Sequence, residues 1–193
     1  MMGTRQAEAT LHHRCPICLD TMVNPRTIKC GHVFCEDCLK RALGILNICP
    51  ICKEPQGIVT GNQPPGQMTW SSMPSSLPGH YGCGTICIQY SFPSGIQGPE
   101  HPNPGQHYSG THRTAYLPDN NEGREVLQLL HRAFNARLVF TVGTSITTGL
   151  SNQITWNDIH HKTNMHGGAH GFGYPDPHYL RRVKEDLAAK GIR

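Results

Sequence analysis

The sequence has no long apolar run, and beyond its N-terminal part it has almost no cysteine. Of its nine cysteines, Cys83 and Cys87 alone lie beyond residue 52, whereas a disulfide framework normally spreads along a small secreted chain. No charged stretch followed by an apolar core opens the chain, and no apolar segment approaches the length of a membrane span. We therefore expect no disulfide scaffold and no membrane partner, and we predict a reducing compartment, the cytosol or the nucleus.

Metal-ligating residues are concentrated where the cysteines are. Seven cysteines and one histidine form four close pairs, namely Cys15/Cys18, Cys30/His32, Cys35/Cys38 and Cys49/Cys52. Two cysteines separated by two residues can direct both sulfurs at one ion, and zinc prefers four such donors in a tetrahedron. The segment is too short to be stabilised by an apolar core alone. The spacing therefore predicts a module held together by two Zn²⁺ ions.

The order of the pairs resembles a RING finger, because it runs Cys-x2-Cys, eleven residues, Cys-x-His-x2-Cys-x2-Cys, ten residues and Cys-x2-Cys. The resemblance implies interleaved pairs, with one ion held by Cys15, Cys18, Cys35 and Cys38 and the other by Cys30, His32, Cys49 and Cys52. Spacing alone leaves open a pairing of neighbouring motifs, as in a treble clef or a tandem zinc ribbon. We assign residues 15–53 to this module and residues 1–14 to a disordered leader.

RING fingers recruit a ubiquitin-charged conjugating enzyme through a shallow apolar groove, and suitable side chains are present. Ile17 and Pro50 lie inside Cys-x2-Cys pairs, and residues 36–46 are expected to form a short helix. The resemblance implies that the enzyme contacts Ile17, Leu43 and Pro50, with Lys53 as a basic bridge to ubiquitin. The alternative is that the helix leucines pack on the zinc-binding segments, and helical spacing favours this for Leu39. For Lys53 the alternative is an ordinary solvated lysine.

The remaining residues, 54–193, are predicted to form a second domain of the α+β class. Strands are expected at residues 84–92, 112–117 and 137–142, with a shorter extended piece at 67–71. An amphipathic helix is expected after Asp119, Asn120 and Asn121, and a second after Pro177. Their predicted inner faces are Val126, Leu129, Leu130, Ala133 and Phe134 in the first and Tyr179, Leu180, Val183 and Leu187 in the second. We interpret Cys83 and Cys87 as core thiols of a strand.

Three polar stretches of this domain indicate a binding site. Residues 156–163 (WNDIHHKT) are dense in ionisable groups, residues 171–177 (GFGYPDP) form a turn into the last helix, and residues 143–149 (GTSITTG) form a hydroxyl-rich loop. Such loops supply hydroxyls and backbone N–H groups of the kind that bind phosphates. Together with residues 101–105 (HPNPG) and 113–119 (RTAYLPD), they resemble the C-terminal domain of the deltex ubiquitin ligases.

The resemblance implies a division of labour between the two domains. The RING finger primes the charged conjugating enzyme, and the second domain binds NAD or ADP-ribose, so that ubiquitin is directed to proteins or to ADP-ribose carried on protein or nucleic acid. Transferred by motif position, the nucleotide contacts are His160, Thr144, Ser145 and Tyr174. The family name also implies a place in Notch signalling. The alternative is a non-catalytic adaptor, in which both domains only hold partners together.

One position departs from the family pattern. Many members carry a histidine directly before Gly-Tyr-Pro-Asp-Pro and an acid on the following helix, a pair suited to deprotonating a hydroxyl. This chain has Phe172 and Asp186 at those positions. Phenylalanine cannot transfer a proton, so either His166 or His170 takes over, or Phe172 stacks on a base or ribose instead. For Asp186, a general base and a solvated helix position remain as alternatives.

Overall fold

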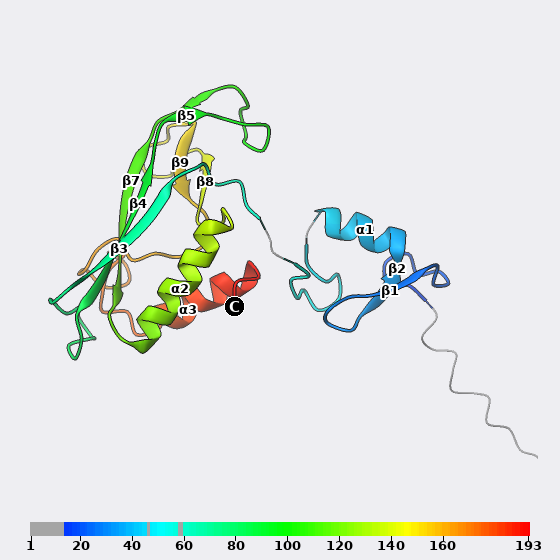
Figure 1. Cartoon of the computed structure of the whole chain (residues 1–193), viewed down its shortest axis with the longest axis horizontal. Helices are drawn as coiled ribbons and strands as arrows, with labels where there is room; N and C mark the ends of the chain where they lie inside the picture. Colours follow the sequence, from blue (N-terminus) through cyan, green and yellow to red (C-terminus); the bar gives the residue numbers. More distant parts are fainter. Residues whose placement is uncertain (1–13, 46, 58–59) are drawn as a thin grey trace, which may run out of the picture. The chain divides into compact units, whose positions relative to one another are not determined.

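The computed structural model describes residues 14–45, 47–57 and 60–193. The chain divides into two compact units, Met1–Val59 and Thr60–Arg193 (Figure 1). Nearly all of the predicted leader, 1–14, and the predicted helix residue Leu46 lie outside the described residues. The first unit continues past Lys53, because the Glu54 carbonyl accepts the Cys49 N–H and the Gln56 N–H donates to the Asn47 carbonyl. Within the described ranges, no helix has the length and apolar character needed to cross a membrane.

The first unit is a small hairpin and one helix. Strands β1 (Pro25–Thr27) and β2 (Val33–Cys35) pair antiparallel, and α1 (Glu36–Ile45) follows at once. Its core consists of Phe34, Leu39 and buried cysteines, with Leu43 partly buried against them. Leu39 is therefore a core residue, as its helical spacing indicated. So few apolar residues cannot offset the chain entropy of the unit without its metal ions.

The second unit contains a three-stranded antiparallel sheet in the order β3-β4-β7. Its strands are β3 (Gln67–Met73), β4 (Thr85–Phe92) and β7 (Thr111–Pro118). Short ladders join β5 (Gly95–Ile96) to β6 (His107–Tyr108) and β8 (Phe140–Gly143) to β9 (Gln153–Trp156). The strands predicted at 84–92 and 112–117 are confirmed, and the piece expected at 67–71 is part of a full strand.

Helices α2 (Asn121–Asn135) and α3 (Tyr179–Ala189) pack against each other, and α2 also contacts β7 (Figure 1). The Asn120 side chain accepts the Gly123 N–H and caps α2. The buried face of α2 contains Leu127, whereas the predicted Leu129 is only partly buried. The predicted inner face of α3 is confirmed in full. Helices and mainly antiparallel strands confirm the α+β class.

Two local predictions need correction. The strand expected from residue 137 begins only at Phe140. The Leu138 N–H donates to the Ala133 carbonyl, so residue 138 is still part of the C-terminal cap of α2. Arg137 itself has a positive φ of 62°, which no strand residue adopts. Cys87 is a buried strand thiol as predicted, but Cys83 is half-buried, precedes β4 and donates to the His80 carbonyl.

An aromatic cluster forms the part of the core that carries the site. Tyr90 and Phe92 are buried in the last part of β4, where buried and more exposed residues alternate, and both contact Phe134 of α2 and Phe140 of β8. Trp156, at the end of β9, stacks on Phe140 with ring centroids 4.4 Å apart. The segment that leaves β9 therefore starts from a partly buried ring that is held against the core.

Candidate functional site

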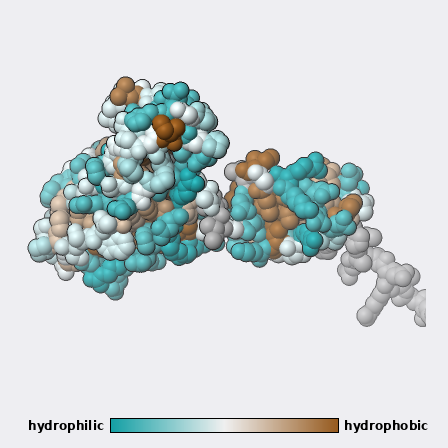
Figure 2. Space-filling view, turned by 45° about the horizontal axis from the view of Figure 1, so that its top comes forward, coloured by the Kyte–Doolittle hydropathy of each residue, from teal (hydrophilic) through white to brown (hydrophobic). Residues whose placement is uncertain are grey.

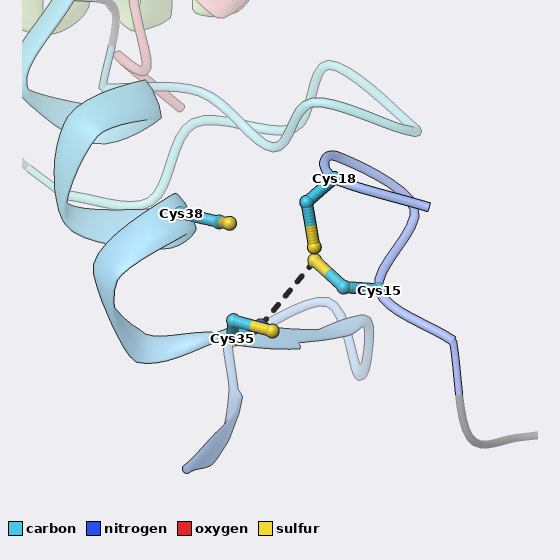
Figure 3. Close-up of side chains that lie close together, drawn as sticks. All are labelled: Cys15, Cys18, Cys35 and Cys38. Carbon is cyan, nitrogen blue, oxygen red and sulfur yellow. Dashed lines mark hydrogen bonds between the residues drawn. The ribbon is translucent and has the colours of Figure 1, made fainter. Parts of the chain in front are cut away.

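The first candidate site is a cluster of four cysteine thiols. Cys15 and Cys18 come from the loop before β1, Cys35 ends β2, and Cys38 lies in the first turn of α1 (Figure 3). Their sulfur atoms all lie within 4.8 Å of one another. A tetrahedral zinc with Zn–S bonds of about 2.3 Å places its sulfurs about 3.8 Å apart, so these thiols fit one zinc ion after a small contraction.

The second cluster contains Cys30, His32, Cys49 and Cys52, whose ligand atoms also lie within 4.8 Å of one another. The Nδ1 atom of His32 is 3.3 Å from the sulfur of Cys30 and 3.5 Å from that of Cys49. His32 therefore presents Nδ1 to the ion. One imidazole and three sulfurs form a donor set typical of structural zinc sites.

The two clusters are interleaved along the chain. The first and third pairs share one site, and the second and fourth pairs share the other. The pairing of neighbouring motifs that spacing left open is thus excluded by geometry. This cross-brace links the ends of the unit to its middle, so both sites are needed to hold the unit together.

The backbone around Cys15 favours its thiolate, the form that binds metal. Burial opposes the Cys15 thiolate, but N–H groups of Cys18, Cys35 and Ile17 outweigh it and lower the Cys15 pKa to about 6. The Cys35 sulfur accepts the Val23 N–H at 3.2 Å. Such N–H to sulfur bonds orient the ligands and reduce the charge concentrated on them.

The residues expected to contact a conjugating enzyme reach the surface of the first unit. Ile17 is 38% exposed and Ile51 45% exposed, Pro50 and Leu43 are half-buried, and apolar side chains are visible on this unit in Figure 2. The exposed Lys53 has a positive φ of 63°, and its Nζ donates to the Pro50 carbonyl at 3.0 Å. Its ammonium group is thus held beside the second zinc cluster.

The third candidate site is a cavity of about 410 Å³ in the second unit. This volume is within the range of small-molecule sites. The wall comes mainly from the end of β9 and the segment after it, with Thr147 from the loop after β8 and Phe172 from the turn before α3. The other lining residues are Trp156, Asn157, Asp158, Ile159, His160, His161 and Thr163. The two stretches singled out in the sequence, 156–163 and 171–177, therefore meet at one cavity.

His160 is oriented within this cavity by Asp186 of α3. The Asp186 Oδ2 atom accepts the His160 backbone N–H at 3.0 Å and lies 2.7 Å from its Nδ1. Because a carboxylate oxygen only accepts, Nδ1 carries a proton and Nε2 is the free nitrogen. The hydroxyl of Tyr179 donates to the His160 carbonyl at 3.0 Å, which fixes the backbone too. The His160 side chain remains 70% exposed.

His161 forms the back wall of the cavity. Its Nδ1 donates to the Ile159 carbonyl at 2.9 Å, so its Nε2 accepts the Tyr90 hydroxyl at 2.8 Å. Burial lowers the pKa of His161 to about 4, which keeps the ring neutral at physiological pH. The ring also stacks on Trp156 at 4.4 Å between centroids. His161 is therefore a structural residue, in contrast to its neighbour.

A buried ion cluster locks the two cavity segments together. The Lys162 ammonium lies 2.7 Å from Asp176 Oδ2, and both side chains are only 4% exposed. Arg182 of α3 contacts the same carboxylate with two nitrogens, at 2.7 and 3.2 Å. Hydrogen bonds from Arg182 and Lys162 hold the pKa of Asp176 well below its usual range, although burial opposes them. The turn before α3 is thereby fixed against the wall that carries His160.

The predicted nucleotide contacts are only partly brought together. His160 and Phe172 line the cavity, whereas Thr144 and Ser145 do not, and Thr147 of the same loop takes their place. Tyr174 needs correction, because its side chain is 1% exposed and its hydroxyl donates to the Tyr116 carbonyl, which leaves no surface for a ligand.

The histidines proposed as substitutes at the Phe172 position also lie elsewhere. His166 and His170 are exposed, and neither belongs to the cavity lining. Asp186 is not a solvated helix residue, since it is bonded to His160. Thr147 and Thr163 were missed, although both lay in stretches singled out for their polar side chains.

Comparison with known proteins assigns a domain family to each of the two units. The family model of the Deltex C-terminal domain matches residues 60–192, and that of the C3HC4-type zinc finger (RING finger) matches residues 14–52. The chain belongs to the deltex family. The resemblance seen in the sequence motifs is thereby confirmed.

Curated relatives carry ligase names. The chain is 56% identical over 181 residues to the "Probable E3 ubiquitin-protein ligase DTX3" of Homo sapiens, covering 92% of this chain and 52% of that protein. It is 45% identical over 201 residues to "E3 ubiquitin-protein ligase DTX4" of Mus musculus, covering 92% and 33%. It is 47% identical over 171 residues to "E3 ubiquitin-protein ligase DTX1" of Homo sapiens, covering 85% and 28%. The chain thus spans about half the length of the first of these relatives, and less of the others.

Proposed function

We propose that this chain is a RING-type ubiquitin ligase whose second unit binds NAD or ADP-ribose as the acceptor or guide for ubiquitin. The observation that carries the second part is the oriented His160 on the wall of a ligand-sized cavity. The ligase names of the relatives and the two zinc clusters support the first part.

The zinc unit would recruit a ubiquitin-charged conjugating enzyme through the apolar residues that reach its surface. Ile17 and Pro50 lie within the metal-binding pairs, so bound zinc ions would fix their backbones. An exposed apolar side chain on a rigid loop loses little entropy on binding. Lys53, held by the Pro50 carbonyl, supplies a positive charge at the same place.

In the second unit, His160 would accept the proton of a ribose hydroxyl. Asp186 holds the proton of Nδ1, so Nε2 can take up a second proton, and the carboxylate stabilises the charged ring that results. The hydroxyl oxygen then attacks the thioester carbonyl of the charged conjugating enzyme. The new C–O bond forms, the C–S bond breaks, and the proton passes through His160 to the departing thiolate or to water. This route needs no histidine at the position of Phe172.

Other cavity groups suit a nucleotide with hydroxyls and phosphates. Thr147, Asn157 and Thr163 present neutral donors and acceptors, and the wall between them is fixed by core contacts. We place the protein in the cytosol or nucleus, where its free thiols stay reduced and where protein or nucleic acid acceptors that bear ADP-ribose occur.

Calorimetric titration of the zinc-loaded chain with ADP-ribose and with NAD tests the cavity. We expect saturable binding by the parent and a loss of about tenfold or more with His160→Ala. His166→Ala is the matched control, because His166 is an exposed histidine outside the cavity. If the parent and His160→Ala gave equal binding heats with these ligands, His160 would not be a nucleotide contact.

Discharge of a ubiquitin-charged conjugating enzyme tests the zinc unit. The parent should accelerate discharge and Ile17→Ala should abolish most of that acceleration, whereas Val23→Ala, also an exposed apolar residue at 62%, should not. If the parent bound the charged enzyme without accelerating discharge, the chain would be a non-catalytic adaptor.

A further inference from the structure

Phe172 is an exposed aromatic residue on the cavity wall. It is 65% exposed, and among the described residues no other aromatic ring packs against it. An apolar ring in water contributes little to folding. Its position therefore calls for an explanation other than packing.

The other large ring of the cavity cannot stack on a ligand. Trp156 has its centroid 4.4 Å from those of both Phe140 and His161, at interplanar angles of 26° and 29°. Two rings that stack this closely cannot share one face of an indole, so they cover opposite faces. Trp156 presents only an edge to the cavity, and Phe172 is the lining phenyl or indole ring with a free face.

The backbone holds Phe172 in a conformation that its side chain disfavours. Its φ is 54°, in the left-handed region where a Cβ atom is unfavourable and glycine is preferred. The turn imposes this conformation, because the Asn164 N–H donates to the Phe172 carbonyl, and the Asn164 side chain donates to the Gly171 carbonyl at 2.6 Å. Gly173 has no room for a side chain, since a Cβ atom there would lie 1.8 Å from the His166 carbonyl oxygen. A phenylalanine at position 172 thus costs folding energy and buries little.

We propose that Phe172 determines which ligand the cavity selects, by stacking its free face on the planar base of a nucleotide while a ribose hydroxyl of the same ligand reaches His160. This inference rests on the proposed function and adds to it the residue that selects the ligand: Phe172 makes the cavity prefer base-bearing nucleotides over sugar phosphates. Stacking on an aromatic side chain accepts any base, because each base has a π face. Adenine and nicotinamide are therefore both candidates for the stacked base.

Calorimetric titrations with ADP-ribose, NAD and ribose 5-phosphate test the proposal, each on the zinc-loaded parent chain and on three variants, Phe172→Leu, Phe172→Tyr and Tyr81→Leu. Phe172→Leu keeps the apolar bulk and removes the π face, and Phe172→Tyr keeps the ring. We expect Phe172→Leu to weaken binding of a base-bearing nucleotide about tenfold and to leave ribose 5-phosphate unchanged, and Phe172→Tyr to stay within about twofold of the parent. If Phe172→Leu loses affinity for both ADP-ribose and NAD, the stacked base is adenine. If it loses affinity for NAD alone, the stacked base is nicotinamide. Tyr81→Leu, at a 79% exposed aromatic residue outside the cavity, is the control.

Thermal unfolding of Phe172→Gly adds an independent measurement. This variant should unfold a few degrees higher than the parent, because glycine relieves the positive φ, while its nucleotide affinity falls as in Phe172→Leu. The proposal is overturned if Phe172→Leu binds nucleotides as the parent does, or if it loses ribose 5-phosphate to the same extent. A parent that binds no nucleotide would overturn the proposed function and this inference together, whereas normal binding by Phe172→Leu would overturn the inference alone.

Discussion

His160 and His161 share a peptide bond but lie in opposite environments. The side chain of His160 is 70% exposed and is hydrogen-bonded to Asp186. The ring of His161, in contrast, stacks on Trp156 and is hydrogen-bonded to the Tyr90 hydroxyl. Successive side chains in extended chain point to opposite sides, so one histidine enters the core and the other faces the cavity. This arrangement makes one ring a structural support and leaves the other available for chemistry.

Asp186→Asn should reduce ubiquitin transfer to ADP-ribose by about 10²-fold, with a much smaller effect on ADP-ribose affinity. The amide lacks the charge that stabilises a protonated His160, and its NH₂ group can force the ring into the other tautomer. Single-turnover transfer measures the chemical step, and calorimetry measures binding. Nitrogen-15 NMR of the His160 ring should show the proton on Nδ1 in the parent and a changed tautomer in the variant.

Glu185→Gln is the control for this prediction, because Glu185 is the neighbouring acid on α3 but is exposed and paired with Arg181 at 3.9 Å. It should transfer ubiquitin like the parent. Equal losses of affinity and of transfer rate in Asp186→Asn would instead indicate that the carboxylate only maintains the fold of the wall.

The stability of the second unit should fall as pH is lowered from about 6.5 to about 4 because of His161. Burial lowers its folded-state pKa to about 4, so the unfolded chain takes up a proton first and unfolding is favoured as pH decreases. The expected loss is on the order of 3 kcal/mol. Burial of the ring and the neighbouring His160 outweigh the Ile159 carbonyl and the charge of Asp186, both of which favour the protonated ring.

Urea unfolding followed by tryptophan fluorescence measures this effect, because both tryptophans, Trp70 and Trp156, belong to the second unit. His161→Gln should be less stable at neutral pH but should lose less stability between pH 6.5 and 4. If the free energy of unfolding of His161→Gln fell between pH 6.5 and 4 as steeply as that of the parent, the pH dependence would belong to other groups.

Lys162→Met should destabilise the second unit by about 3–5 kcal/mol, because it leaves the buried Asp176 carboxylate with Arg182 as its remaining ion-pair partner. The same urea experiment measures the loss. Lys190→Met is the matched control: Lys190 also lies 2.7 Å from a carboxylate, but its partner Asp158 is 77% exposed in the side chain. The control should change stability by no more than about 1 kcal/mol. Equal losses in both variants would contradict the buried role of the Lys162 pair.

Removal of zinc should unfold the first unit and leave the second intact. Each structural zinc contributes on the order of 10 kcal/mol of binding free energy coupled to folding, which the small core of residues 14–57 cannot replace. Elemental analysis should find two zinc ions per folded chain. A chelator should then erase the NMR signals of the first unit without changing the tryptophan fluorescence of the second.

Cys49→Ser should reproduce the effect of the chelator in the first unit, whereas Cys83→Ser should retain both ions, since Cys83 is a free thiol of the second unit. If the first unit of metal-free Cys49→Ser were folded, its apolar core would be sufficient for folding, and zinc would not be what stabilises it.

The amino-acid sequence by itself determined the features whose partners are close along the chain. The spacing of Cys15 and Cys18, the periodic apolar positions of α3 and the run of strand-forming residues in β4 each predict structure from a few neighbouring residues. The family motifs are also contiguous, so the deltex resemblance was visible before the fold.

Only the tertiary structure decided which of these groups act together. Asp186 reaches His160 across 26 residues, and Asp176 reaches Lys162 across 14, because α3 packs beside the segment after β9. The same packing buried Tyr174, left Phe172 with a free face and turned adjacent histidines to opposite sides. Local sequence fixes secondary structure and short chelating loops, whereas burial, tautomer and pairing depend on how distant elements pack, which no short stretch of residues encodes.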